Sequence, residues 1–181
     1  MTLRRGFKSE ANYYAREFRT ELGLELSAPL NPWKLAEHLA IPVVPLCEFA
    51  ESIGPVCANW FAVSGTDFSA ATVFDGTRRL IVHNDNHSLR RQASNIAHEL
   101  AHGILCHPPT PPLNDHGCRN FDRVIEDEAN WLGPALLISE EAALRIVKIR
   151  MPIEKACEHY GASAELINMR IGVTGARKRT G

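Results

Sequence analysis

Two histidines and a glutamate form the most chemically specific pattern in this chain. His98 and His102 lie four residues apart, and Glu99 directly follows the first of them. On a helix with 3.6 residues per turn, both imidazoles lie on one face and can reach one ion, with Glu99 beside its open side. This spacing is typical of zinc hydrolases, in which the glutamate acts as a general base.

The residues around this pattern favour the helix that the chemistry requires. The segment 89–105 contains no proline, and its apolar residues recur with the period of a half-buried helix. Asn86 or Ser88 can cap its start, and Pro108 follows its end. We therefore predict a helix that carries all three residues of the pattern.

A zinc hydrolase needs a third protein ligand, and nearby residues do not supply one. The metzincin pattern requires a glycine and a histidine where this chain has Leu105 and Pro108. Cys106 lies one turn further along the same face, but on a straight helix its Cα is roughly 12 Å from that of His98. His107 points away from that face. Both Cys106 and His107 are predicted to be structural.

Acidic residues at the start of a second apolar segment, 125–138, are better candidates. One inward-facing carboxylate from this segment would complete a site of two histidines and one glutamate, with water in the fourth position. The other carboxylates would be solvated residues that complement the helix dipole. For Glu126 and Asp127 the solvated role is favoured, whereas Glu128 remains the stronger candidate.

The two motifs together resemble the ImmA/IrrE family of zinc metallopeptidases, small bacterial and phage proteins associated with regulated repressors. The resemblance covers most of the chain. It includes an arginine-rich lead-in, Ala-His-Glu-Leu-x-His at 97–102, a trailing His107, and Glu-x-Glu-Ala-Asn at 126–130 followed by a Leu-Leu pair. A strand that ends in Asn84 is also shared. The resemblance implies a zinc site in which Glu128 is the third ligand.

The chain departs from the family pattern at two places. Ser94-Asn95 replaces the usual Phe-Thr before the first motif, and Leu132-Gly133-Pro134 replaces the usual Phe-Ala-Ala after the second. A proline inside a helix removes a hydrogen bond and usually kinks the helix. We therefore expect the second helix to bend beyond Glu128.

Composition favours a small soluble enzyme. The chain has 181 residues, of which 45% are hydrophobic, and a formal net charge of −1, which argues against nucleic-acid binding over its whole surface. Its five cysteines are scattered and are expected to be reduced thiols. The sequence shows neither an export signal nor a run long enough to span a membrane. We predict a cytoplasmic protein with a metallopeptidase domain at 1–150 and a small helical unit at 151–181.

The remaining patterns predict a zincin-like α+β fold, with a small antiparallel or mixed sheet packed on the helices that carry the metal site. Ser9 is expected to cap a first helix that Gly23 closes, and Asn31 to cap a second at 33–40. Strands are predicted at 41–46, 56–63, 70–74 and 80–83, with a turn at Asp75-Gly76 between the last two. An exposed strand edge would hold an extended peptide substrate, and the proline-rich segment 107–118 is either a plain connection or a lid.

The C-terminal residues 153–171 resemble a helix-turn-helix, with a turn at Gly161 and Ser163 as the second cap. Acidic residues in both helices oppose phosphate contact, so DNA binding by this unit is disfavoured. The basic residues 177–179 are expected to be a disordered, solvated end and not an arm that binds nucleic acid.

Three hypotheses about function follow. The first is a zinc endopeptidase that cleaves a partner protein, expected from the resemblance to be a helix-turn-helix repressor, with Glu99 as the proton acceptor. The second is a zinc-stabilised module that binds such a partner without cleaving it, and the third is a DNA-binding regulator. Asn130 is a candidate for orienting a ligand. No spacing rule selects the donor that would stabilise the oxyanion from His83, His87, Arg90, His116, His159 and Tyr160.

Overall fold

The protein combines a small sheet, which packs against one long helix, with further helices that pack mainly on one another. The computed structural model describes residues 3–53, 68–76, 78–108 and 122–180. Its elements are α1 (Phe7–Glu21), α2 (Pro32–His38), β1 (Val43–Pro45), α3 (Leu46–Ile53), β2 (Ala70–Asp75), β3 (Arg78–His83), α5 (Leu89–Ile104), α6 (Arg123–Leu137), α7 (Glu140–Lys148), α8 (Ile153–Tyr160), α9 (Ala164–Val173) and α10 (Ala176–Thr180). The predicted α+β class is confirmed.

The described strands form a mixed sheet in the order β1-β3-β2. β1 pairs in parallel with β3, and β2 pairs with β3 in an antiparallel hairpin. Gly76 in the hairpin turn has a φ of +59°, a conformation that glycine adopts without steric cost. The predicted strand at 41–46 is shorter than expected because α3 already begins at Leu46. The predicted strand at 56–63 lies outside the described residues.

The first two helices position the N-terminal segment beside the central helices. α1 begins at Phe7, so the prediction that Ser9 caps it is wrong. Gly6 occupies the cap position with a φ of +85°, and the fully buried Phe7 ties the first turn to the core. Gly23 ends α1 in the left-handed conformation, as predicted. The predicted cap of α2 is confirmed, because the Asn31 side chain accepts from two backbone N–H groups.

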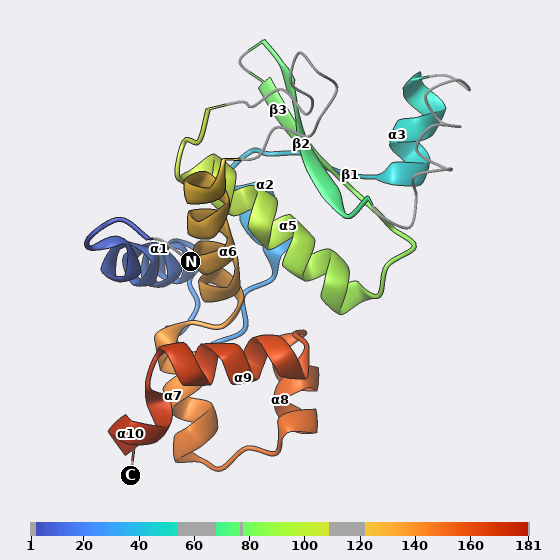
Figure 1. Cartoon of the computed structure of the whole chain (residues 1–181). Helices are drawn as coiled ribbons and strands as arrows, with labels where there is room; N and C mark the ends of the chain where they lie inside the picture. Colours follow the sequence, from blue (N-terminus) through green and yellow to red (C-terminus); the bar gives the residue numbers. More distant parts are fainter. Residues whose placement is uncertain (1–2, 54–67, 77, 109–121, 181) are drawn as a thin grey trace.

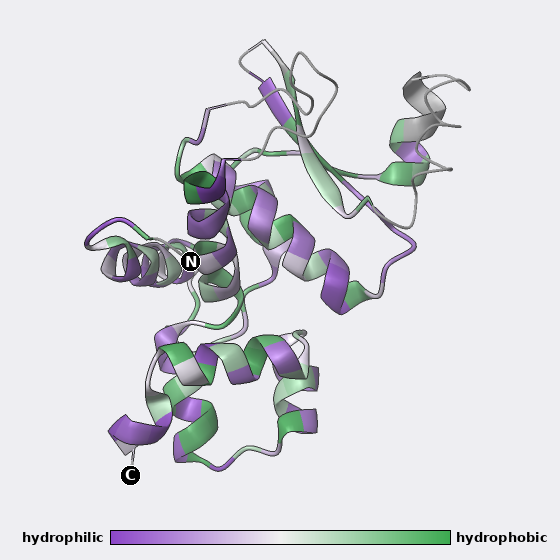
Figure 2. Ribbon diagram, viewed as in Figure 1, coloured by the Kyte–Doolittle hydropathy of each residue, from purple (hydrophilic) through white to green (hydrophobic). Residues whose placement is uncertain are grey.

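α5 lies between the sheet and α6 at the centre of the molecule (Figure 1). Ile96 and Leu100 of α5 and Leu132 and Leu136 of α6 are completely buried in one core cluster. Figure 2 shows polar and apolar stretches alternating along α5, as the predicted half-buried helix requires. α6 continues through Pro134 to Leu137. Pro134 has no N–H to donate to the carbonyl of Asn130, four residues earlier, and the predicted bend beyond Glu128 stays a prediction.

A second core cluster joins the C-terminal helices α7 to α10 to the end of α6. The predicted pair of helices around Gly161 is present as α8 and α9, and the Ser163 hydroxyl accepts from the backbone of Leu166. The division at residues 150 and 151 remains a prediction. The prediction that residues 177–179 are disordered is wrong, because they lie within α10. Across the described segments, every helix is too short or too polar to cross a lipid bilayer.

Arg19 connects α1 to the end of α6 from a completely buried position. Its guanidinium donates to the carbonyls of Ala15, Ala28, Leu136 and Leu137 at 2.8 to 3.1 Å. Burial lowers its pKa to about 10, with the charges of Glu141 and Tyr160 opposing that shift. The arginine thus satisfies carbonyls at the C-terminus of α6 that have no partner within the helix.

Replacement of Arg19 by methionine should lower the free energy of unfolding by about 3 kcal/mol, because buried carbonyls lose their donors. This corresponds to a fall in Tm of roughly 6–12 °C for a chain of this size. Arg16→Met is the matched control, since Arg16 lies one turn earlier and is half-exposed, and it should cost less than about 1 kcal/mol. Thermal unfolding of the two variants would contradict the assigned role of Arg19 if both fell equally.

Candidate metal centre

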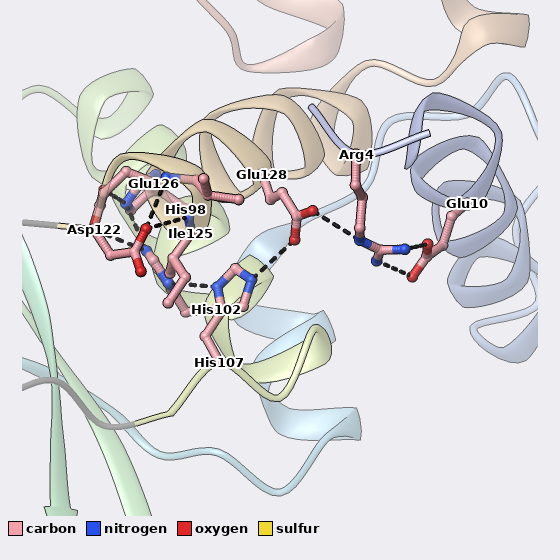
Figure 3. Close-up of polar contacts among 10 residues, drawn as sticks. Arg4, Glu10, His98, His102, His107, Asp122, Ile125, Glu126 and Glu128 are labelled. Atoms are coloured by element: carbon pink, nitrogen blue, oxygen red, sulfur yellow. Dashed lines mark hydrogen bonds and ion pairs between the residues drawn. The ribbon is translucent and has the colours of Figure 1, made fainter. Parts of the chain in front are cut away.

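α5 brings its two motif histidines together on the face that packs against α6. The Nε2 atoms of His98 and His102 lie 3.1 Å apart, and their rings meet edge to face. Both imidazoles are partly buried beneath the first turns of α6 (Figure 3). The predicted placement of the two histidines on one helical face is therefore confirmed.

Glu126 supplies the carboxylate of this group. Its Oε2 is 3.4 Å from Nε2 of His98, and its Oε1 is 3.7 Å from Nε2 of His102. Neighbouring ligands of a tetrahedral zinc ion with bonds of about 2.0–2.1 Å are separated by about 3.3–3.4 Å. The three side chains thus fit one divalent ion, and their ligand atoms all lie within 4.8 Å of one another.

Glu128, the ligand implied by the family resemblance, is not part of this group. Its side chain is buried, and its Oε1 accepts a hydrogen bond from Nε of Arg4 at 2.8 Å. Its Oε2 lies 3.3 Å from Nε2 of His107 (Figure 3). Metal coordination by Glu128 stays a prediction, while the carboxylate that lies beside the histidines belongs to Glu126.

The periodicity of α6 contains a signal that identifies Glu126. Glu126, Asn130 and Gly133 are spaced at i, i+4 and i+7, which places them on one helical face, whereas Glu128 is rotated by about 200° from Glu126. At Gly133 α6 lies close to α5: a Cβ added there would lie 3.1 Å from backbone atoms of Ala97 and His98. The face that includes this glycine must therefore point at the histidines.

Gly133→Val should consequently separate the two helices and displace His98. Overpacking of this kind costs about 1–3 kcal/mol, and we expect zinc affinity to fall together with stability. Gly172 in α9 is a matched control, because a Cβ added there meets nothing within 4 Å. Gly172→Val should leave both quantities close to their wild-type values. Chemical unfolding and zinc titration of the two variants measure the difference.

The surroundings shift the pKa values of the two histidines in opposite directions, lowering that of His102 and raising that of His98. Burial lowers the pKa of His102 to about 4, and the neighbouring His98 and His107 act in the same direction. Burial also acts to lower the pKa of His98, but hydrogen bonds with Glu126 and Asn130 and the charge of Glu99 raise it overall. A neutral imidazole is the form that binds a metal. The orienting role of Asn130 stays a prediction.

Glu99 lies about 100° around α5 from His98, on the side that contacts β2. The hydroxyl of Thr72 on β2 donates to its Oε2 at 2.7 Å. Burial raises the pKa of Glu99, and the hydrogen bond from Thr72 partly opposes this shift. Thr72 could not be identified from the sequence, because nothing local to β2 shows that its hydroxyl reaches a carboxylate of α5.

The remaining polar candidates are distributed over other parts of the fold. Tyr160 donates to the carbonyl of Ser27, and its neighbour His159 also lies at the end of α8. His83 is buried in β3, where burial lowers its pKa. His116 lies outside the described residues. None of these positions identifies an oxyanion donor.

The similarity of the chain to known proteins is found at the level of a family model. No curated protein sequence matches the chain. Residues 56–172 match the peptidase family model described as the IrrE N-terminal-like domain. The match covers well over half of the chain and includes both helices of the candidate centre. The chain therefore belongs to the ImmA/IrrE family of peptidases.

Proposed function

We propose that the protein is a zinc-dependent endopeptidase in which His98, His102 and Glu126 hold the metal. The observation that carries this proposal is that the ligand atoms of the two α5 histidines and of Glu126 on α6 lie 3.1 to 3.7 Å apart. Glu99 directly follows the first of these histidines on α5. When bound, zinc supplies Lewis acidity, which makes water a stronger acid and a carbonyl a better electrophile.

Glu99 is the group that moves the proton. Its carboxylate accepts a proton from the attacking water and passes it to the nitrogen of the scissile peptide bond. The C–N bond then breaks and releases a free amino group. Its raised pKa favours this return, because a carboxyl group in a buried site holds a proton more readily. Thr72 fixes one carboxylate oxygen, which leaves the other available to water.

β2 is the strand best placed to hold the substrate. Within the described residues, β2 forms one side of the sheet, with β3 on its inner edge. It also carries Thr72, the residue that contacts Glu99. An extended peptide paired with the outer edge of β2 would place its backbone beside the catalytic carboxylate.

The proposed substrate is a protein, and the family resemblance points to a helix-turn-helix repressor. The direct test mixes the purified chain with the repressor encoded beside its gene, with zinc or with a chelator. A discrete cleavage product that requires zinc supports the proposal. Tight binding without any product in zinc-loaded protein would overturn it and favour a regulatory module.

A further inference from the structure

We propose that His107, Glu128 and Arg4 form an outer chain of hydrogen bonds that orients His102 toward the metal. This inference rests on the proposed metal site and assigns a role to residues outside it. Nδ1 of His102 lies 2.9 Å from Nδ1 of His107, and Nε2 of His107 lies 3.3 Å from Oε2 of Glu128. Arg4 completes the chain at the other carboxylate oxygen (Figure 3).

The direction of each hydrogen bond follows from the last acceptor. An ionised carboxylate only accepts, so Nε2 of His107 must carry the proton that is donated to Glu128. A neutral imidazole has one N–H, which makes Nδ1 of His107 an acceptor. His102 must then donate from its own Nδ1, and its Nε2 keeps a free lone pair. That lone pair is the one directed at His98 and Glu126.

Burial and charge make this arrangement specific. The side chains of His107 and Glu128 are only 9% and 8% exposed, so a carboxylate here needs compensation. Arg4 provides it, and Arg4 is itself held by two contacts to Glu10 of α1. Arg4 and Glu128 are 124 residues apart in the chain. The segment that precedes α1 therefore takes part in positioning a metal ligand.

These residues are positioning residues, because they act on the metal through His102. Substitution of such outer partners typically costs about 10–100-fold in metal affinity. We expect Glu128→Gln to weaken zinc binding within that range while the stoichiometry stays at one ion per chain. Arg4→Gln should weaken zinc binding less, and the double variant should be no weaker than Glu128→Gln alone, since both act through one chain of contacts.

The experiment measures zinc affinity by competition with a chelating dye, using the full chain. Arg5→Gln is the matched control, because Arg5 is the exposed neighbour of Arg4, and it should bind zinc as the wild type does. A second measurement, 15N NMR of the zinc-loaded protein, should show His102 protonated at Nδ1 in the wild type. In Glu128→Gln that signal should broaden or shift.

Two results would overturn the inference. Wild-type zinc affinity in both Glu128→Gln and Arg4→Gln would show that this series of hydrogen bonds has no effect on metal binding. Loss of zinc in Glu128→Gln as complete as in Glu126→Gln would instead identify Glu128 as a ligand. Both results presuppose that the wild type binds zinc. If the wild type itself does not bind zinc, the proposed function fails. If the wild type binds zinc and the variants bind it equally well, only the present inference fails.

Discussion

Glu99→Gln is expected to reduce peptidase turnover by about 10²–10⁴-fold, the usual contribution of a general base, while zinc affinity stays near that of the wild type. The amide keeps the size of the side chain and a polar contact for Thr72, but it cannot accept a proton from water. Because Glu99 is hydrogen-bonded to Thr72 and is not one of the three ligands, the substitution should leave the ligand set unchanged.

Single-turnover cleavage of the zinc-loaded protein measures this effect. Glu165→Gln is a suitable control, since Glu165 is exposed at the start of α9, and it should cleave at the wild-type rate. Full turnover by Glu99→Gln would remove Glu99 from the mechanism. Loss of zinc from this variant would show that Glu99 supports the metal site.

Glu126→Gln should have the largest effect on metal binding. We expect its zinc affinity to fall by more than about 100-fold, because loss of a charged ligand must exceed the 10–100-fold cost of losing an outer partner. Glu126 faces both motif histidines, whereas Glu128 faces Arg4 and His107.

Equilibrium zinc titration and elemental analysis of the purified variants measure the difference between these two glutamates. Glu128→Gln is the comparison, with the same chemical change two residues along the same helix. A larger loss in Glu128→Gln than in Glu126→Gln would reverse the assignment of the third ligand and return it to the residue implied by the family resemblance.

The histidine helix could be predicted from the sequence because its determinants are local. The spacing of His98 and His102, the apolar period of α5 and the following prolines all act within one segment. The hairpin of β2 and β3 and the paired helices α8 and α9 were predictable for the same reason. In each, a left-handed glycine, Gly76 or Gly161, marks the turn.

The third carboxylate could not be chosen with the same certainty, because the choice depends on the rotation of α6 against α5. That rotation is decided by packing between helices, and in particular by the close approach at Gly133. A family motif with two glutamates does not show which one faces the histidines. The contact of Arg4 with Glu128 is still harder to foresee, because it joins distant parts of the chain.

The start of α1 illustrates a different limit. Ser9 is a favourable cap residue, yet Gly6 takes the cap position and the helix begins at Phe7. Burial of Phe7 in the core outweighs the local preference for a serine cap. Thr72 was likewise hidden, since its partner Glu99 lies on a different element.

A crystal structure of the zinc-soaked protein, with anomalous scattering data collected at the zinc edge, tests the central claim most directly. We expect one strong peak at about 2.0–2.2 Å from Nε2 of His98, Nε2 of His102 and a carboxylate oxygen of Glu126, with Glu128 still bound to Arg4 and His107. A peak coordinated by Glu128, or none near the two histidines, would contradict the account.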